Sequence, residues 1–205
     1  MASAQLVRAI SQKLQELFDD LINHKVKEFK VMNEELLPDG LKPHTRSICW
    51  LAEQVILQNT KKNQDAYGLT RFEYPDSDIA PWDVRFRVAG IDDSKDIYVN
   101  IKVSDATRPV RRNDIASVKT LLNFFRNTND PIIFFVVFKL RFNNVRIVFE
   151  APTIVRFYPW IREFVVNPRN EHIQAIYEVP IVEQSLDAFI ALLKEKAEDK
   201  GLNIP

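Results

Sequence analysis

Two strand-like segments carry a carboxylate and an ammonium group whose spacing would let them act together on a charged substrate. Asp83 lies in PWDVRFRVAG (81–90), and Lys102 lies in DIYVNIKVS (96–104). Polar and apolar residues alternate in both segments, which is the pattern of half-buried strands. The short, turn-like link GIDDSKD (90–96) predicts that the two strands form an antiparallel hairpin.

The register of this hairpin decides whether the two charged groups meet. The apolar faces of the strands must coincide, because a slip by one residue would bury charged side chains. A turn centred on Asp92 and Asp93 pairs Asp83 with Lys102, and it pairs Arg85 with Asn100. A register shifted by two residues leaves Asp83 and Lys102 as diagonal neighbours. We therefore expect the carboxylate and the ammonium group side by side on a polar face.

Two interpretations of this pair remain open. The first is a cross-strand ion pair on a solvated sheet face, which would contribute little to stability. The second is a phosphodiesterase site, in which the carboxylate binds Mg²⁺ and the lysine orients or activates the attacking water. Mg²⁺ suits such a site because it accepts one or two carboxylates and keeps several waters.

A combination of motifs favours the second interpretation. Pro81-x-Asp83 followed by Asn100-x-Lys102 resembles the PD-(D/E)xK nuclease signature, and the order of elements over 45–140 is similar to that of a subset of type II restriction endonucleases. The resemblance implies an α/β fold of the mixed α+β kind: a restriction-endonuclease-like core with a central mixed β-sheet flanked by helices. It also implies a Mg²⁺-dependent, sequence-specific endonuclease that hydrolyses phosphodiester bonds in double-stranded DNA.

The resemblance also implies a role for each residue of the site. Asp83 and Lys102 would be catalytic, and Glu53, on a preceding helix, would complete the site. Asp83, Glu53 and the main-chain carbonyl of Ile101 would bind Mg²⁺. Asn100 stands where the family has a second acidic residue, and it brings no charge. Because of Asn100, one alternative is a non-catalytic nucleic-acid- or protein-binding module on a degenerate nuclease fold. Another alternative on the same core is a DNA repair or junction nuclease.

The elements around these residues must hold them in place. We expect a right-handed parallel crossover from the strand at 97–104, through a helix at 114–127 capped by Asp114, to a strand at 131–140. The last of these is apolar without alternation, as expected for a strand buried on both faces. The pattern predicts a single endonuclease-like domain over 1–205. Its N-terminal part, 1–35, contains a helix over 3–30, and its catalytic core, 45–142, begins with a helix at 45–62. Additional strands and a DNA-reading loop follow over 143–182, and a C-terminal helix spans 185–199.

Two polar loops carry the residue types that bind DNA. Between Lys102 and Lys119, five basic residues oppose two acidic ones in a protein of zero formal net charge. Arginine suits phosphates and guanine edges, whereas asparagine and glutamine suit adenine. Solvated loops with ordinary ion pairs are the alternative. The candidate DNA-binding residues are Arg108, Arg111, Arg112, Asn113 and Lys119 in the first region, and Arg169, Asn170, His172 and Gln174 in the second.

The composition excludes several other classes of protein. One cysteine and three well-separated histidines offer no zinc-binding spacing, and four glycines leave no phosphate-binding glycine-rich loop. The N-terminus lacks the apolar run of a signal peptide, and the longest apolar run, PIIFFVVF (131–138), is too short to span a bilayer. We therefore expect a cytoplasmic protein without membrane contact. We also expect a homodimer, because two-fold symmetry suits the cutting of both strands of a symmetric DNA site.

Overall fold

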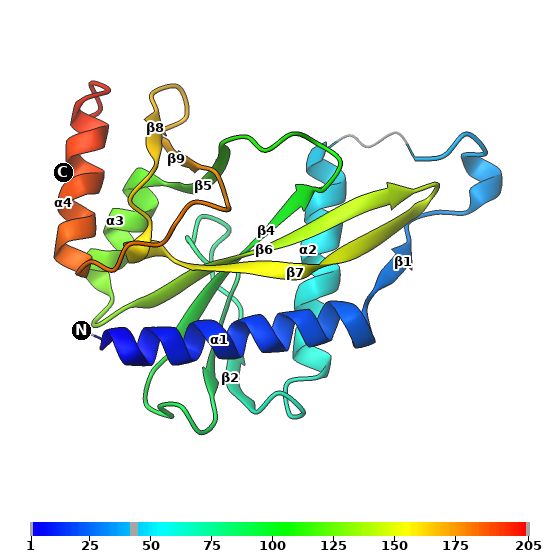
Figure 1. Ribbon diagram of the computed structural model, residues 1–205, viewed down its shortest axis with the longest axis horizontal. Coiled ribbons are helices and arrows are strands. Elements are labelled where there is room, and N and C mark those ends of the chain that lie inside the picture. Colours follow the sequence, from blue (N-terminus) through cyan, green and yellow to red (C-terminus); the bar gives the residue numbers. More distant parts are fainter. Residues whose placement is uncertain (1, 42–44, 204–205) are drawn as a thin grey trace.

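A six-stranded mixed sheet forms the centre of the protein, and helices flank it on both faces (Figure 1). The structure is a computed structural model that describes residues 2–41 and 45–203. The strand order is β1-β7-β6-β4-β3-β2, in which β4 and β6 are parallel and the other neighbours are antiparallel. The expected α/β class with a flanked, mixed central sheet is confirmed. The strands are β1 (Glu28–Lys30), β2 (Leu69–Glu73), β3 (Val84–Val88), β4 (Ile97–Asp105), β6 (Ile132–Asn143) and β7 (Arg146–Phe157).

Helices and a second, smaller sheet cover the central sheet. One hydrophobic core contains the buried faces of α1 and α2, and a second contains those of α3, α4 and the small sheet. The small sheet is antiparallel and has the strand order β5-β9-β8. These elements are α1 (Ala4–Asp20), which continues into a π-helical turn (Leu21–Lys25), α2 (Thr45–Lys62), α3 (Val118–Asn127), α4 (Leu186–Glu198), β5 (Asn113–Ser117), β8 (Val165–Asn167), β9 (His172–Ala175) and 3₁₀ turns at Glu34–Leu36 and Tyr158–Trp160.

Strand β6 lies between the two hydrophobic cores. Phe134, Val136 and Phe138 belong to the core under α1 and α2, whereas Phe135 and Val137 belong to the core under α3 and α4. All five side chains are fully buried. The apolar run without alternation is therefore a strand buried on both faces, as expected. Its parallel pairing with β4, through α3, also confirms the expected parallel connection.

The helix expected over 114–127 begins later than the sequence suggested. Residues 113–117 form β5, in which Asp114 lies opposite Gln174 of β9. The helix starts at Val118, and the Ser117 side chain caps it by accepting a hydrogen bond from the Thr120 backbone amide. The cap expected at Asp114 is therefore wrong, because strand pairing with a distant segment takes up that residue.

The N-terminal helix also ends earlier than expected, and it closes one edge of the central sheet. Residues 28–30 form β1 instead of a helix, and β1 pairs with only the first three residues of β7. Further along β7, Asp19 accepts a hydrogen bond from the Thr153 backbone amide at 2.7 Å. Gln15 donates to the Thr153 carbonyl at 2.8 Å. Side chains of α1 thus satisfy backbone groups of β7 beyond the reach of β1. Within the ranges described, no helix is long and apolar enough to cross a membrane.

Candidate functional site

The β3–β4 pair brings the motif residues together with a register different from the one first expected. Val84 lies opposite Val99, and Arg85 lies opposite Tyr98. Continued by one residue, this register puts Asp83 level with Asn100 and diagonal to Lys102. The direct pairings of Asp83 with Lys102 and of Arg85 with Asn100 are therefore wrong, and the register shifted by two residues holds. The apolar faces still coincide, as the burial argument required.

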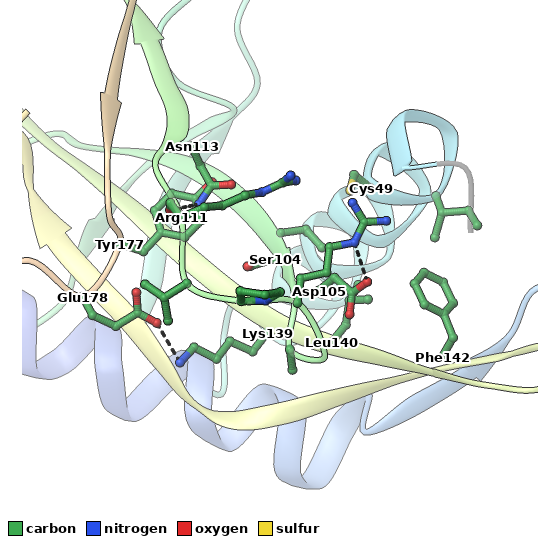
Figure 2. Close-up of a pocket in the computed structure, with 16 residues that line it drawn as sticks. Cys49, Ser104, Asp105, Arg111, Asn113, Lys139, Leu140, Phe142, Tyr177 and Glu178 are labelled. Atoms are coloured by element: carbon green, nitrogen blue, oxygen red, sulfur yellow. Dashed lines mark hydrogen bonds and ion pairs between the residues drawn. The ribbon is translucent and has the colours of Figure 1, made fainter. Parts of the chain in front are cut away.

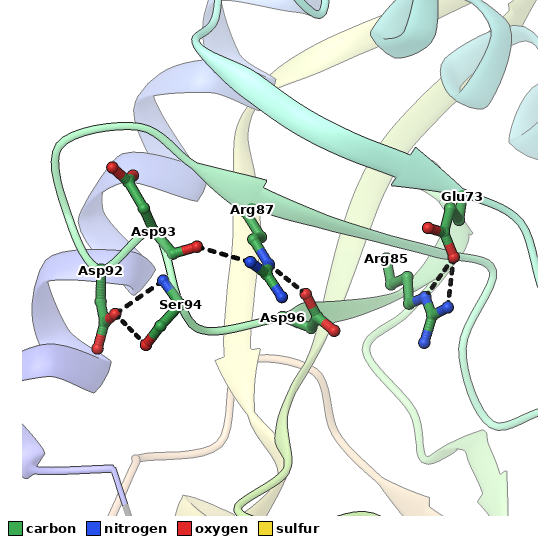
Figure 3. A network of polar contacts seen from close by, with 7 residues as sticks. All are labelled: Glu73, Arg85, Arg87, Asp92, Asp93, Ser94 and Asp96. Atoms are coloured by element: carbon green, nitrogen blue, oxygen red, sulfur yellow. Dashed lines mark hydrogen bonds and ion pairs between the residues drawn. The ribbon is translucent and has the colours of Figure 1, made fainter.

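A polar network in the connection between the strands accounts for this shift (Figure 3). The guanidinium of Arg87 donates to Asp96 at 2.6 Å and to the Asp93 carbonyl at 2.9 Å. The Asp92 carboxylate accepts hydrogen bonds from the backbone amide and the hydroxyl of Ser94. These bonds hold residues 92–96 as an ordered loop outside the ladder. The turn is consequently centred one residue earlier than expected.

Asp83 lies immediately before the first residue of β3, and its carboxylate accepts a hydrogen bond from the backbone of β4. Its backbone amide donates to the Val99 carbonyl at 2.9 Å. Its Oδ2 accepts a hydrogen bond of 2.6 Å from the backbone amide of Ile101. Burial raises the pKa of Asp83 above its usual range, although the positive charge of Lys102 and the Ile101 hydrogen bond act in the opposite direction. The other carboxylate oxygen, Oδ1, has no hydrogen-bond partner in the described chain.

Glu53 reaches the same place from α2. Burial raises its pKa to about 7, while Lys102 lowers it and the negative charge of Asp83 raises it further. The two carboxylates and the ammonium group therefore lie within electrostatic reach of one another. No direct ion pair joins Lys102 to either acid within the parts of the chain described. The structure thus brings Glu53, Asp83 and Lys102 to one site.

Asn100 lies level with Asp83 on the neighbouring strand and has one polar atom unsatisfied. Its side chain is only 6% exposed. Nδ2 donates to the Pro81 carbonyl at 2.8 Å, which fixes the orientation of the amide. Oδ1 is buried without a partner. Such orphaned acceptors are uncommon, because they have lost water without gaining a replacement bond.

The oxygens at this site are of the kind that Mg²⁺ prefers, namely carboxylate and amide oxygens. Within the described residues, no group of three or more His, Cys, Asp and Glu side chains is placed to hold a metal ion. At this site the acidic candidates are Asp83 and Glu53, and position 100 is an asparagine. The Oδ1 of Asp83, the Glu53 carboxylate and the orphaned Oδ1 of Asn100 are the candidate side-chain ligands for a hard cation. The Ile101 carbonyl stays a predicted ligand.

A cavity of about 410 Å³ lies beside the motif residues. Asn100 and Lys102 line one part of it, and Asp114, Ser117 and His172 line another. His172, which was expected to bind DNA, is thereby brought next to the catalytic candidates. The cavity provides space for a polar substrate group at the end of Lys102.

Asp114 ties together the two regions that were expected to bind DNA. Its carboxylate accepts hydrogen bonds from Gln174 at 2.6 Å and from Asn170 at 2.9 Å. His172 Nδ1 lies 3.6 Å from the same carboxylate. Sequence reasoning missed this role, because Asp114 was interpreted as a helix cap. Its position opposite Gln174 was the only available signal, and it depends on a strand pairing that no local pattern reveals.

The basic side chains around these regions divide into paired and unpaired groups. Arg108 is held by Asp105 at 3.1 Å, and Lys119 is held by Glu171 at 2.9 Å. A cavity of about 180 Å³ lies beside the loop that carries Arg108 and Arg111. The guanidinium of Arg111 extends away from the other labelled residues of this cavity (Figure 2). The unpaired group, which has no ion-pair partner in the chain as described, consists of Arg111, Arg112 and Arg169. Asn113 donates to the Arg111 carbonyl and so braces the loop.

Comparisons with known proteins support the fold. No family model matches the chain, and no curated protein matches its sequence. Among solved structures, the fold is similar to that of NlaIV restriction endonuclease, with a TM-score of 0.57 and 13% sequence identity over 89% of this chain and 78% of that chain. At this identity the likeness concerns the fold alone. The protein therefore has a restriction-endonuclease-like fold, with the motif residues on its central hairpin.

Proposed function

We propose that this protein is a Mg²⁺-dependent, sequence-specific endonuclease of double-stranded DNA, with the character of a type II restriction enzyme. One observation carries the proposal: Asp83, Lys102 and Glu53 come from three elements to one partly buried site. Isolated surface ion pairs do not need this arrangement, and they do not raise the pKa of a glutamate to about 7 by burial. The similarity to a restriction endonuclease fold supports the assignment.

Each residue has a defined task in this proposal. Asp83 and Glu53 would hold Mg²⁺, together with the Asn100 side-chain oxygen and the Ile101 carbonyl. When bound, the ion supplies stabilisation of the negative charge on the phosphoryl oxygens. The Ile101 amide holds the Asp83 carboxylate in position through its 2.6 Å hydrogen bond. Lys102, at the adjoining cavity, orients and activates the attacking water.

The proposed substrate contacts lie on the basic loop and the small sheet. Arg111 and Arg112 are exposed and free to contact phosphates. A homodimer is the expected assembly, because two copies related by two-fold symmetry can each cut one strand of a symmetric site. Sequence reading is assigned to the residues around Asp114, where amide and imidazole groups gather.

A second candidate function is a non-catalytic DNA-binding module on the same fold. The observation in its favour is Asn100, which leaves the site with one acidic residue fewer than the family motif. An asparagine brings no charge to a cation, and a site that had lost catalysis would tolerate it. The two functions differ in one measurable property, which is metal-dependent cleavage.

Cleavage of a long mixed-sequence duplex by the purified protein tests the proposal. The reactions contain either Mg²⁺ or EDTA, and the Asp83→Asn variant serves as the control for contaminating nuclease. We expect the wild-type protein to produce discrete fragments with Mg²⁺ and none with EDTA, and the Asp83→Asn variant to produce none in either reaction. A smear indicates an unspecific nuclease, and cutting confined to branched or damaged duplexes indicates a repair or junction enzyme. Binding without cleavage supports the non-catalytic module and contradicts the proposed chemistry.

A further inference from the structure

A shallow hollow of about 410 Å³ lies on the small sheet, away from the motif residues. Its floor is formed by Val165, Val166 and Pro168. Its polar rim comes from three separate segments of the chain: the loop before β5, the β8–β9 hairpin and the turn after α4. The rim residues are Arg112, Asn167, Arg169, Gln174 and Lys200.

The charged side chains that line this hollow are all of one sign. Arg112, Arg169 and Lys200 are exposed cations, and no carboxylate is among the described residues that line the hollow. None of the three forms an ion pair with a described residue. Elsewhere some exposed cations, such as Arg141, are paired with glutamates, and others, such as Lys25, have no ion-pair partner among the described residues. The hollow differs because three such cations line one concave surface. Three unpaired cations that converge on one concave surface create a local positive potential, which attracts an anion.

The hollow also connects to the candidate active site through one hydrogen bond. Gln174 lines the hollow, and its amide donates to Asp114 at 2.6 Å. Asp114 in turn lines the cavity that contains Asn100 and Lys102. Both cavities thus border β9, which contributes His172 to the first and Gln174 to the second.

We propose that the hollow binds a backbone phosphate of duplex DNA, at a position separate from the phosphate that is cleaved. The inference rests on the proposed function in one respect, which is that the ligand is DNA. It assigns Lys200 to the interface, a residue that no sequence motif indicated. It also assigns Arg169 to a phosphate instead of a guanine, because its guanidinium converges with two other cations on a concave surface. Phosphate contacts of this kind position the protein without reading sequence.

A triple variant tests this site: Arg112→Gln, Arg169→Gln and Lys200→Gln. Its affinity for a duplex is measured in EDTA at several salt concentrations, so that cleavage plays no part. The dissociation constant should rise at least tenfold near 0.1 M salt, and the salt dependence should flatten by about 0.9 per lost phosphate contact. The loss should be equal for every single-base-substituted duplex. The matched control is Lys25→Gln, Lys27→Gln and Lys62→Gln, which removes the same charge from exposed positions on other elements.

The outcomes separate this inference from the proposed function. If the triple variant changes the affinity and the salt slope no more than the control variant does, the hollow is not a binding site. A loss of affinity restricted to duplexes with particular base pairs would overturn the inference as well. Melting temperatures of both variants close to that of the wild type exclude unfolding as the cause. Wild-type protein that binds no duplex overturns both proposals. Binding that depends on the hollow, in a protein that cleaves nothing with Mg²⁺, supports the hollow and contradicts the nuclease.

Discussion

The Asp83 carboxylate accepts a 2.6 Å hydrogen bond from the backbone amide of Ile101, so a candidate catalytic acid also completes the β3–β4 ladder. Only Oδ2 is used in this bond, which leaves Oδ1 available to a cation. The bond directs the carboxylate toward the middle of β4, where Asn100 and Lys102 lie. Stability and chemistry at Asp83 can therefore be separated by choosing the substitution.

We predict that Asp83→Asn abolishes cleavage and barely changes stability, whereas Asp83→Ala abolishes cleavage and also lowers stability. The asparagine side chain can still accept the Ile101 hydrogen bond, but it no longer supplies a negative charge. Alanine leaves a backbone amide unsatisfied, which costs roughly 1–3 kcal/mol. Cleavage assays and urea denaturation of both variants measure the two effects. An Asp83→Asn variant that cuts at the wild-type rate would remove Asp83 from the catalytic group.

Lys102→Met provides the corresponding test of the lysine. Methionine is close in length to the lysine stem and lacks the ammonium group, so we expect a folded protein that still binds DNA and does not cleave it. The loss should appear in the turnover rate more than in the affinity for a duplex, because the proposed role of Lys102 is to orient water. Single-turnover cleavage at saturating protein distinguishes the two. A variant that loses only affinity would make Lys102 a phosphate contact.

The raised pKa of Glu53, about 7, predicts a specific dependence of stability on pH. Its ordinary value is 4.5, so between these two values the unfolded chain ionises while the folded protein keeps the proton. The folded state then binds more protons, and stability falls as pH rises from about 4.5 to about 7. Below this window Glu53 has no effect on the pH dependence. The loss is on the order of 3 kcal/mol at most.

Glu53→Gln isolates this contribution, because glutamine keeps the shape of the side chain and does not ionise. Urea denaturation of the wild type and the variant in EDTA, near pH 5 and near pH 8, gives the difference. We expect the variant to be more stable than the wild type near pH 8 and similar to it near pH 5. Parallel pH profiles for the two proteins would show that Glu53 is solvated in the folded state.

Asn100→Asp should change metal dependence without destroying activity, and Asn100→Leu should be more harmful. The aspartate adds a hard anionic ligand, but it loses the 2.8 Å hydrogen bond to the Pro81 carbonyl and adds buried charge. We therefore expect a lower melting temperature in EDTA and a larger increase on adding Mg²⁺ than in the wild type. Leucine removes both polar atoms. If the Asn100→Asp variant did not cleave DNA while the Asn100→Leu variant was fully active, Asn100 would not face the metal.

Asp114→Ala should tighten DNA binding while reducing discrimination between sequences. Removing one negative charge close to the unpaired arginines favours the phosphate backbone by roughly 1 kcal/mol, or about fivefold in affinity. The same change releases Gln174 and Asn170, which would no longer be held in fixed orientations. Binding to a cognate duplex and to single-base-substituted duplexes measures both effects. Asp65→Ala, at an exposed acid in the turn after α2, is the control for lost charge.

The elements close to the motif were predictable because their signals are local. Alternation located β3 and β4, and a continuous apolar run identified β6 as a strand buried on both faces. The neighbourhood of Asp83 and Lys102 followed from the requirement that the apolar faces coincide, whereas Glu53 was implied only by the resemblance to nucleases. The exact register did not follow, because it depends on how Arg87 and Asp92 order the loop between the strands.

The start of α3 was missed for a related reason. A short polar segment before an apolar helix has the same local pattern whether it caps the helix or forms a strand. Asp114 belongs to β5 only because β9, far later in the chain, pairs with it. The same pairing hides the link between the two basic regions, which the sequence presents as separate loops.

The contacts between α1 and β7 have a consequence for how copies of this protein can associate. An open edge strand offers unpaired amides and carbonyls that recruit further strands, and it is the usual starting point for strand exchange and fibril growth. Here β1 covers the beginning of β7, and Asp19 and Gln15 occupy backbone groups of Thr153. Growth of the sheet across this edge would require α1 to leave its hydrophobic core. Truncation of α1 should therefore produce aggregates rich in intermolecular β-structure.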